Sequence, residues 1–128
     1  MKNEENREDS REKKPEVTSK SYTLRNKTGQ WLGQVVLTSD GMFASVTDWG
    51  NLSYAWRSFG TDFREFILNL SPDYFGTKMF TGMAYILHSR KCEAACNRFA
   101  KEILPALQQA LLDEIEAETA NLQLTTEN

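Results

Sequence analysis

Cysteine and histidine are scarce in this 128-residue sequence, which contains only Cys92, Cys96 and His88 of these two types. Two cysteines exclude the multi-disulfide framework that stabilises small secreted domains. The spacing places all three side chains on one face of a helix, but a structural zinc site takes four ligands, usually from two clusters. We therefore expect the cysteines to pack as small hydrophobic residues, and we expect no metal and no other cofactor.

Catalytic motifs are also missing. The seven glycines form neither the dinucleotide-binding fingerprint nor a phosphate-binding loop, and no nucleophile elbow is present. The candidate acids Asp40, Asp48, Asp62 and Asp73 fall at expected turns or helix starts, where short carboxylates accept local backbone N–H bonds. The sequence predicts no catalytic residue and no enzymatic activity, and a small-ligand pocket beside Asp48 and His88 is the least favoured alternative.

Long apolar runs are absent, since no stretch approaches the roughly 20 residues that span a bilayer. The start of the chain lacks the apolar segment of a secretory signal. We expect a cytoplasmic protein without membrane contact. The 15 Lys and Arg are outnumbered by 18 Asp and Glu, giving a net charge of −3. No basic cluster of the kind that binds duplex nucleic acid is visible, so nucleic acid is possible but not favoured as a partner.

Composition divides the chain into three parts. Residues 1–20 mix basic and acidic side chains with almost no apolar ones, which predicts a disordered charged tail or one that orders on a partner. Residues 21–117 have the length and apolar content of a single α+β domain. Residues 118–128 follow an acidic stretch without Lys or Arg, and we expect them to fray because negative charge is unfavourable at a helix C-terminus.

The first half of the domain shows the two-residue period of β-strands with turn residues between the runs. Asp40-Gly41 is a strong hairpin signal, and Gly29 suits a turn that requires positive φ. Loops this short join only antiparallel neighbours, so the pattern predicts a three- or four-stranded antiparallel meander. The expected strands are Ser21–Lys27, Trp31–Thr38, Met42–Thr47 and Leu52–Ser58.

The second half shows helical periodicity. Thr61 or Asp62 is expected to cap a short helix that begins near Phe63, and Ser71 with Pro72 begins a second. Residues 83–87 fit either a helix or a buried strand. A long amphipathic C-terminal helix follows, and Pro105 should kink or restart it. The helices are expected to cover one face of the meander, with a core that includes Phe63, Phe66, Ile67, Phe99 and Ile103.

The densest group of aromatic residues surrounds the expected turn of residues 48–51 and the strand after it. Trp49, Asn51, Tyr54 and Arg57 are candidates for binding a protein partner, because Trp, Tyr and Arg are enriched at interface hot spots. Alternatively, Tyr54, Trp56 and Arg57 could stack on the bases of single-stranded nucleic acid. A third interpretation makes the aromatic residues the core face of the sheet.

The acidic end of the long helix is a second candidate surface. Glu114 and Glu118 lie either on a solvated face or on a docking surface for a basic partner. A homodimer through an exposed sheet edge or through the long helix is also possible.

The stretch from Gly29 to Leu70 resembles small proteins encoded by bacteriophages and prophages. The resemblance rests on a strand pair that ends in the turn of residues 48–51, a strand like residues 53–56, and a glycine followed by a helix like residues 62–66. It covers about residues 21–87 and implies an origin rather than an activity, because such proteins are mostly of unknown function. Some small phage proteins inhibit host defence nucleases, as anti-CRISPR proteins do. We therefore expect a non-enzymatic phage accessory protein that binds a host or phage protein in the bacterial cytoplasm.

Overall fold

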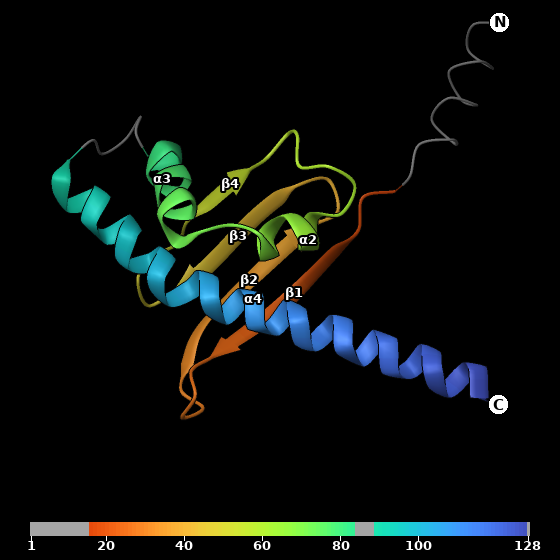
Figure 1. Ribbon diagram of the computed structural model, residues 1–128. Helices are drawn as coiled ribbons and strands as arrows, with labels where there is room; N and C mark the ends of the chain where they lie inside the picture. The colour runs from red at the N-terminus through yellow and green to blue at the C-terminus, as the bar shows by residue number, and fades with distance from the viewer. Residues whose placement is uncertain (1–15, 84–88, 128) are drawn as a thin grey trace, which may run out of the picture.

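The computed structural model describes residues 16–83 and 89–127 and has an α+β architecture. Four strands form one antiparallel sheet in the order β1-β2-β3-β4, followed by two short helices and one long helix (Figure 1). The meander and the helices after it confirm the predicted fold class. The elements are β1 (Ser19–Arg25), β2 (Trp31–Thr38), β3 (Met42–Thr47), β4 (Ser53–Ala55), α2 (Phe63–Leu68), α3 (Pro72–Met83) and α4 (Arg90–Glu127).

The two central strands have the predicted bounds, whereas the outer strands differ. β1 lies two residues earlier than predicted, because the Asn26 side chain accepts hydrogen bonds from the backbone N–H groups of Thr28 and Gln30 and begins the turn there. Ser19 and Lys20 therefore belong to the sheet rather than to the predicted tail, and residues 1–15 of that tail lie outside the described residues. β4 is much shorter than the predicted strand from Leu52 to Ser58.

β4 ends at Ala55, and the chain separates from β3 soon after Trp56. On either side of β4, Leu52 accepts a hydrogen bond from the Ser45 N–H, and the Trp56 N–H donates to the carbonyl of Gly41. Gly41 has a φ of 102°, and an added Cβ would lie 2.2 Å from the Trp56 carbonyl oxygen. These two hydrogen bonds continue the pairing just beyond each end of β4, and the absence of a side chain at Gly41 allows the two backbones to approach this closely.

α2 and α3 begin where the sequence predicts. The Asp62 side chain accepts a hydrogen bond from the Arg64 N–H at the start of α2, and the Ser71 hydroxyl accepts one from the Tyr74 N–H at the start of α3. Met83 is the last residue of α3, and the rest of the segment that fitted helix or strand lies outside the described residues. No helix in the described part of the chain is long and apolar enough to cross a membrane.

α4 is a single helix that continues through Pro105, so of the predicted kink or restart, the restart does not occur. Pro105 is exposed, and so is Lys101, whose carbonyl loses its helical partner. Solvent can therefore reach the unpaired carbonyl. The sequence predicts fraying beyond Ala117, whereas α4 runs past this residue to Glu127. Arg64 bonds to Glu118 and supplies the positive charge that this part of the helix lacks.

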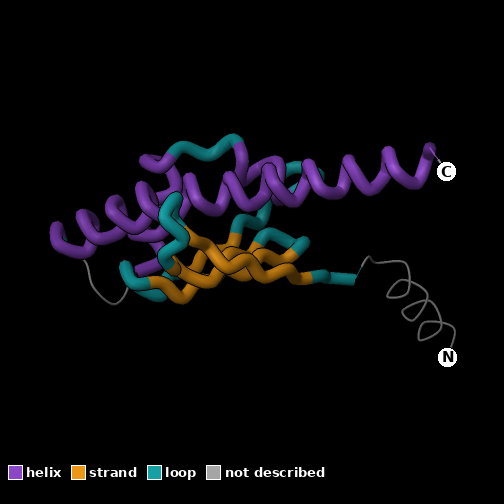
Figure 2. Tube along the Cα trace, turned by 90° about the horizontal axis from the view of Figure 1, so that it is seen from below, coloured by secondary structure: helices purple, strands orange, loops and turns teal. Residues whose placement is uncertain are grey.

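The hydrophobic core lies between the sheet and the helices, which cover one face only (Figure 2). Phe75 is fully buried beside Phe43 and Phe99, with ring centroids 5.1 and 6.2 Å away. Of the five predicted core residues, four are buried, and Phe66 is half-buried against Trp56. Cys96 is buried and Cys92 half-buried, whereas His88 lies outside the described residues. Among the residues described, no group of three potential ligands could hold a metal ion.

Candidate functional site

The four residues predicted to bind a partner around the third turn do not form one patch. Trp49 is half-buried, and its backbone N–H donates to the Thr47 hydroxyl inside the turn. Tyr54 points inward from β4, and its ring centroid lies 4.8 Å from that of Trp56. Only Asn51 and Arg57 are exposed. In the structure, therefore, Trp49 belongs to the turn and Tyr54 packs toward the core. Asn51 and Arg57 lie on the surface.

The burial of Trp56 contradicts its predicted place on a base-stacking surface. It is 5% exposed, its ring stacks on Phe75 with centroids 6.2 Å apart, and its indole N–H donates to the Tyr74 hydroxyl. A nucleic-acid base cannot reach this ring without opening the core. The interpretation that these aromatics form the core face of the sheet is confirmed for Trp56.

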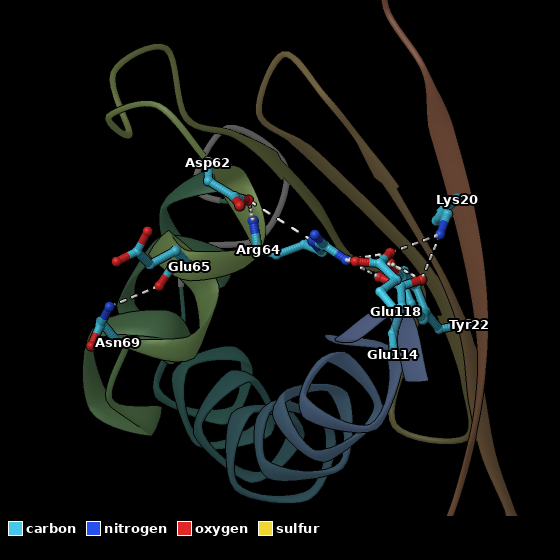
Figure 3. A network of polar contacts seen from close by, with 8 residues as sticks. All are labelled: Lys20, Tyr22, Asp62, Arg64, Glu65, Asn69, Glu114 and Glu118. Atoms are coloured by element: carbon cyan, nitrogen blue, oxygen red, sulfur yellow. Dashed lines mark hydrogen bonds and ion pairs between the residues drawn. The ribbon is translucent and has the colours of Figure 1, made fainter. Parts of the chain in front are cut away.

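The two acidic residues predicted to dock a basic partner are instead bonded within the molecule (Figure 3). Glu114 accepts hydrogen bonds from the Lys20 ammonium at 3.0 Å, the Tyr22 hydroxyl at 2.9 Å and Arg64 Nη1 at 2.8 Å. Glu118 accepts from the same Arg64 nitrogen at 3.0 Å and lies 3.7 Å from the Lys20 ammonium. This polar network joins β1, α2 and the second half of α4.

The network shifts the protonation equilibria of its members. Burial alone would raise the pKa of Glu114, but the hydrogen bonds from Arg64, Lys20 and Tyr22 outweigh it and lower that pKa. Burial and the hydrogen bond to Glu114 raise the pKa of Tyr22. Glu114 is therefore a stable anion at neutral pH, and Tyr22 is a stable neutral donor. Neither group is poised to exchange a proton near pH 7.

A cleft of about 540 Å³ opens beside the network, between the start of β1, the end of β2, the start of α2 and the second half of α4. Leu37 and Phe63 contribute apolar surface to it, and Lys20, Arg64 and Glu118 contribute charge. These charged groups bond to one another, so the cleft is a structural junction that holds α4 on the sheet. Sequence reasoning missed Lys20, Tyr22 and Arg64, because their partners lie at least 50 positions away along the chain.

The face of the sheet opposite the helices is a second candidate surface. No element of the described chain covers it (Figure 2). We call it the open face and define it by the side chains that alternate with the buried ones along β2, β3 and β4. These residues are Gln34, Val36, Thr38, Met42, Ala44, Val46, Ser53 and Ala55.

The open face is apolar at its centre and uncharged. Val36 pairs with Ala44 across β2 and β3, and Met42 pairs with Ala55 across β3 and β4. Met42 is 46% exposed and Val46 is 56% exposed. Exposed aliphatic side chains gathered on one surface are typical of a binding site for another macromolecule. Sequence alternation could have indicated these residues, but it could not show that the face stays uncovered.

Comparison with known proteins identifies the group to which this chain is related. No curated protein and no solved structure matches it. A family model described as a phage family, Phage_phiTE_072, matches residues 10–86. The match covers the whole sheet, α2 and α3, and ends before α4. Because it spans more than half of the chain and agrees with the resemblance over residues 21–87, this protein belongs to that phage family.

Proposed function

We propose that this phage protein acts by binding another protein, and that the open face of its sheet is the binding surface. The observation that carries the proposal is the exposure of Met42 and Val46 on a sheet face that no described element covers. Burying apolar surface yields about 25 cal/mol per Å², so such a face gains free energy when a partner covers it.

A protein fits this face better than a nucleic acid does. The open-face residues of β2, β3 and β4 include no Lys or Arg, whereas phosphate recognition depends on these cations. Trp56, which would have stacked on bases, is buried. An uncharged aliphatic surface instead matches the apolar centre of a protein–protein interface.

The proposed role is non-enzymatic. In the cleft beside the polar network, the carboxylates of Glu114 and Glu118 are bonded to Arg64 and Lys20, so they serve the fold. Membership of a phage family supports a host or phage protein as the partner, encountered in the bacterial cytoplasm. Inhibition of a host defence protein is the specific form of this role that we propose, because small phage proteins can act by covering a surface of such a target.

The test is a tagged capture experiment from lysates of infected bacteria, with nuclease treatment and quantitative mass spectrometry. Val46→Glu places a charge on the open face, and Leu112→Glu is the matched control, because Leu112 is 50% exposed but lies on α4. We expect a stoichiometric partner with the wild-type chain and with Leu112→Glu, reduced at least tenfold with Val46→Glu. Equal capture by both variants would refute the open face as the binding surface, and loss of the partner after nuclease treatment would support nucleic-acid binding instead.

A further inference from the structure

We propose that the outer edge of β1 receives an extended basic segment of a partner protein as a fifth strand, which the projecting end of α4 then covers. This site is separate from the open face, because it uses backbone groups at the border of the sheet rather than side chains on its surface. Its test therefore does not depend on the proposed function.

β1 has backbone groups that the sheet does not use. It is the first strand of the sheet, and among the described strands it pairs with β2 alone. The Ser39 N–H donates to the Thr18 carbonyl, and hydrogen-bonded pairs recur at every second residue of an antiparallel pair. The alternate residues Ser19, Ser21 and Thr23 therefore direct their backbone N–H and C=O groups away from β2. Such groups are a template on which another chain can pair as a strand.

The features that usually protect a strand edge are missing from the middle of β1. The strand contains no proline, and the register shift between Leu24 and Arg25 lies at its end. Lys20 is of a type that commonly blocks edges, but its ammonium points toward α4 and bonds within the polar network. The opposite edge differs, since β4 has three residues and an added Cβ at Gly82 of α3 would lie 3.1 Å from the Ser53 carbonyl oxygen. β1 is therefore the edge at which a strand can be added.

α4 is longer than the sheet that it covers. It crosses β1 at Glu114, which bonds to Lys20 and Tyr22, and then projects past the edge of the sheet (Figure 1). The stretch from Glu118 to Glu127 adds about 14 Å of helix, whereas a fifth strand would lie about 4.8 Å from β1. The projecting end is therefore long enough to cover a strand added to β1, as the preceding part of α4 covers β1 and β2.

The charge of the projecting helix selects a basic segment. α4 carries no Lys or Arg after Lys101, and its carboxylates outnumber the two cations, Lys20 and Arg64, that bond to them. Glu118 lies at this edge, 3.7 Å from the Lys20 ammonium, and its side chain is 45% exposed. Residues of the added strand that face α4 therefore approach carboxylates, so Lys or Arg is favoured at these positions.

The other side of the added strand lies on the same side of the sheet as the open face. Its neighbours there are Ser21 and Thr23, whose side chains are exposed, so a β-branched residue such as threonine suits these positions. Because side chains alternate along a strand, the expected segment alternates a basic residue with a β-branched one. Backbone hydrogen bonds to the edge supply the affinity, and the alternate side chains supply the specificity.

Amide hydrogen exchange of the full chain, followed by NMR, tests this proposal. The probe is a peptide of about seven residues in which lysine alternates with threonine. In the free chain, the Ser21 and Thr23 amides should exchange fast, whereas the Tyr22 amide, which bonds to β2, should exchange slowly. Peptide at about 2 mM should slow exchange at Ser21 and Thr23 by about tenfold or more. A peptide with glutamate in place of lysine should bind about tenfold more weakly.

Two substitutions at one residue test the role of the backbone. Ser21→Pro removes the outward N–H, and proline is tolerated in an edge strand where the missing donor faces solvent. Ser21→Ala is the matched control, since both variants lose the hydroxyl that accepts a hydrogen bond from Gln34 Nε2 at 3.1 Å, but alanine keeps the N–H. We expect Ser21→Pro to weaken peptide binding by about tenfold and Ser21→Ala to change it by less than about twofold. Far-UV circular dichroism and thermal melts establish that both variants fold.

The proposal is overturned if the lysine peptide leaves exchange at Ser21 and Thr23 unchanged, or if Ser21→Pro binds it as tightly as Ser21→Ala. Protection of these two amides in the free chain also overturns it. Protection that increases with protein concentration would assign the edge to a second copy, and protection independent of concentration would assign it to another segment of the same chain. The proposed function fails separately, since Val46→Glu should bind the peptide normally whether or not it loses a captured host protein.

Discussion

Replacing Glu114 with glutamine removes one negative charge from the centre of the polar network and preserves the shape of the side chain. In the wild-type protein this carboxylate accepts hydrogen bonds from Lys20, Tyr22 and Arg64. In the variant the amide keeps one acceptor oxygen, and its NH₂ group faces the Lys20 ammonium or the Arg64 guanidinium, neither of which can accept a hydrogen bond. Arg64 keeps its bond to Glu118, so the network is weakened rather than abolished.

The expected loss follows from the exposure of each pair. A hydrogen bond to a charged group contributes about 1.5–3 kcal/mol, whereas an exposed ion pair contributes about 0–1 kcal/mol. The Glu114 side chain is only 18% exposed, but the Lys20 side chain is 59% exposed, so the bonds to Arg64 and Tyr22 dominate. We expect Glu114→Gln to lower the free energy of unfolding by about 2 kcal/mol and Tm by roughly 7 °C.

The pH dependence gives this prediction a second readout. Because the network lowers the pKa of Glu114 in the folded state, its stabilisation is complete above the unfolded value of about 4.3. It is lost as the pH falls through the lower, folded-state pKa. The difference in stability between the wild type and Glu114→Gln should therefore be full at pH 7 and should shrink once the pH drops below about 4.3.

Urea unfolding followed by circular dichroism at a series of pH values measures both effects. Glu116→Gln is the matched control, since Glu116 lies on the same helix, is exposed, and its side chain makes no hydrogen bond or ion pair in the described part of the structure. It should change the stability by no more than about 0.5 kcal/mol. The reasoning is refuted if both variants lose the same stability, or if the loss in Glu114→Gln does not diminish in acid.

Three further predictions concern other parts of the fold, each measured by urea unfolding. Gly33→Ala should cost about 1–3 kcal/mol, because the added Cβ would lie 2.5 Å from Thr47 Cγ2, and an unchanged midpoint would contradict this packing. Asp62→Ala should cost about 1 kcal/mol by removing the cap of α2, whereas no loss would show that the cap is dispensable. Burial and Glu114 raise the pKa of Tyr22, so its stabilisation is present below the unfolded value of about 10 and is lost at higher pH. The stability gap between the wild type and Tyr22→Phe should narrow from pH 8 to pH 11, and a constant gap would argue against the shift.

Local sequence was sufficient for most of the secondary structure. β2 and β3 have the predicted bounds, because alternating side chains and a glycine turn specify a hairpin within about 17 residues. The starts of α2 and α3 were also predictable, since Asp62 and Ser71 bond to N–H groups two and three residues away. Such features depend on neighbours in the chain, so the pattern of residues contains them.

The outer strand β4 and the end of α4 could not be predicted in the same way. β4 ends where Trp56 meets the backbone of Gly41, a contact between residues on different strands. α4 continues past Ala117, where a residue of α2, Arg64, bonds to Glu118. The helix or strand propensity and the charge of one segment contain no information about a hydrogen-bond partner that lies on another segment.

The sequence by itself determined the class of fold, the hairpin, the helix caps and most of the core, because each follows from spacing and short-range hydrogen bonds. It also indicated the phage family to which the chain belongs. The tertiary structure decided which acidic side chains form hydrogen bonds within the molecule, since Glu114 contacts Lys20 only when α4 lies across β1. It also decided which face of the sheet is uncovered. Alternation gives every strand two faces, and only the path of the helices across one of them leaves Met42 and Val46 exposed on the other.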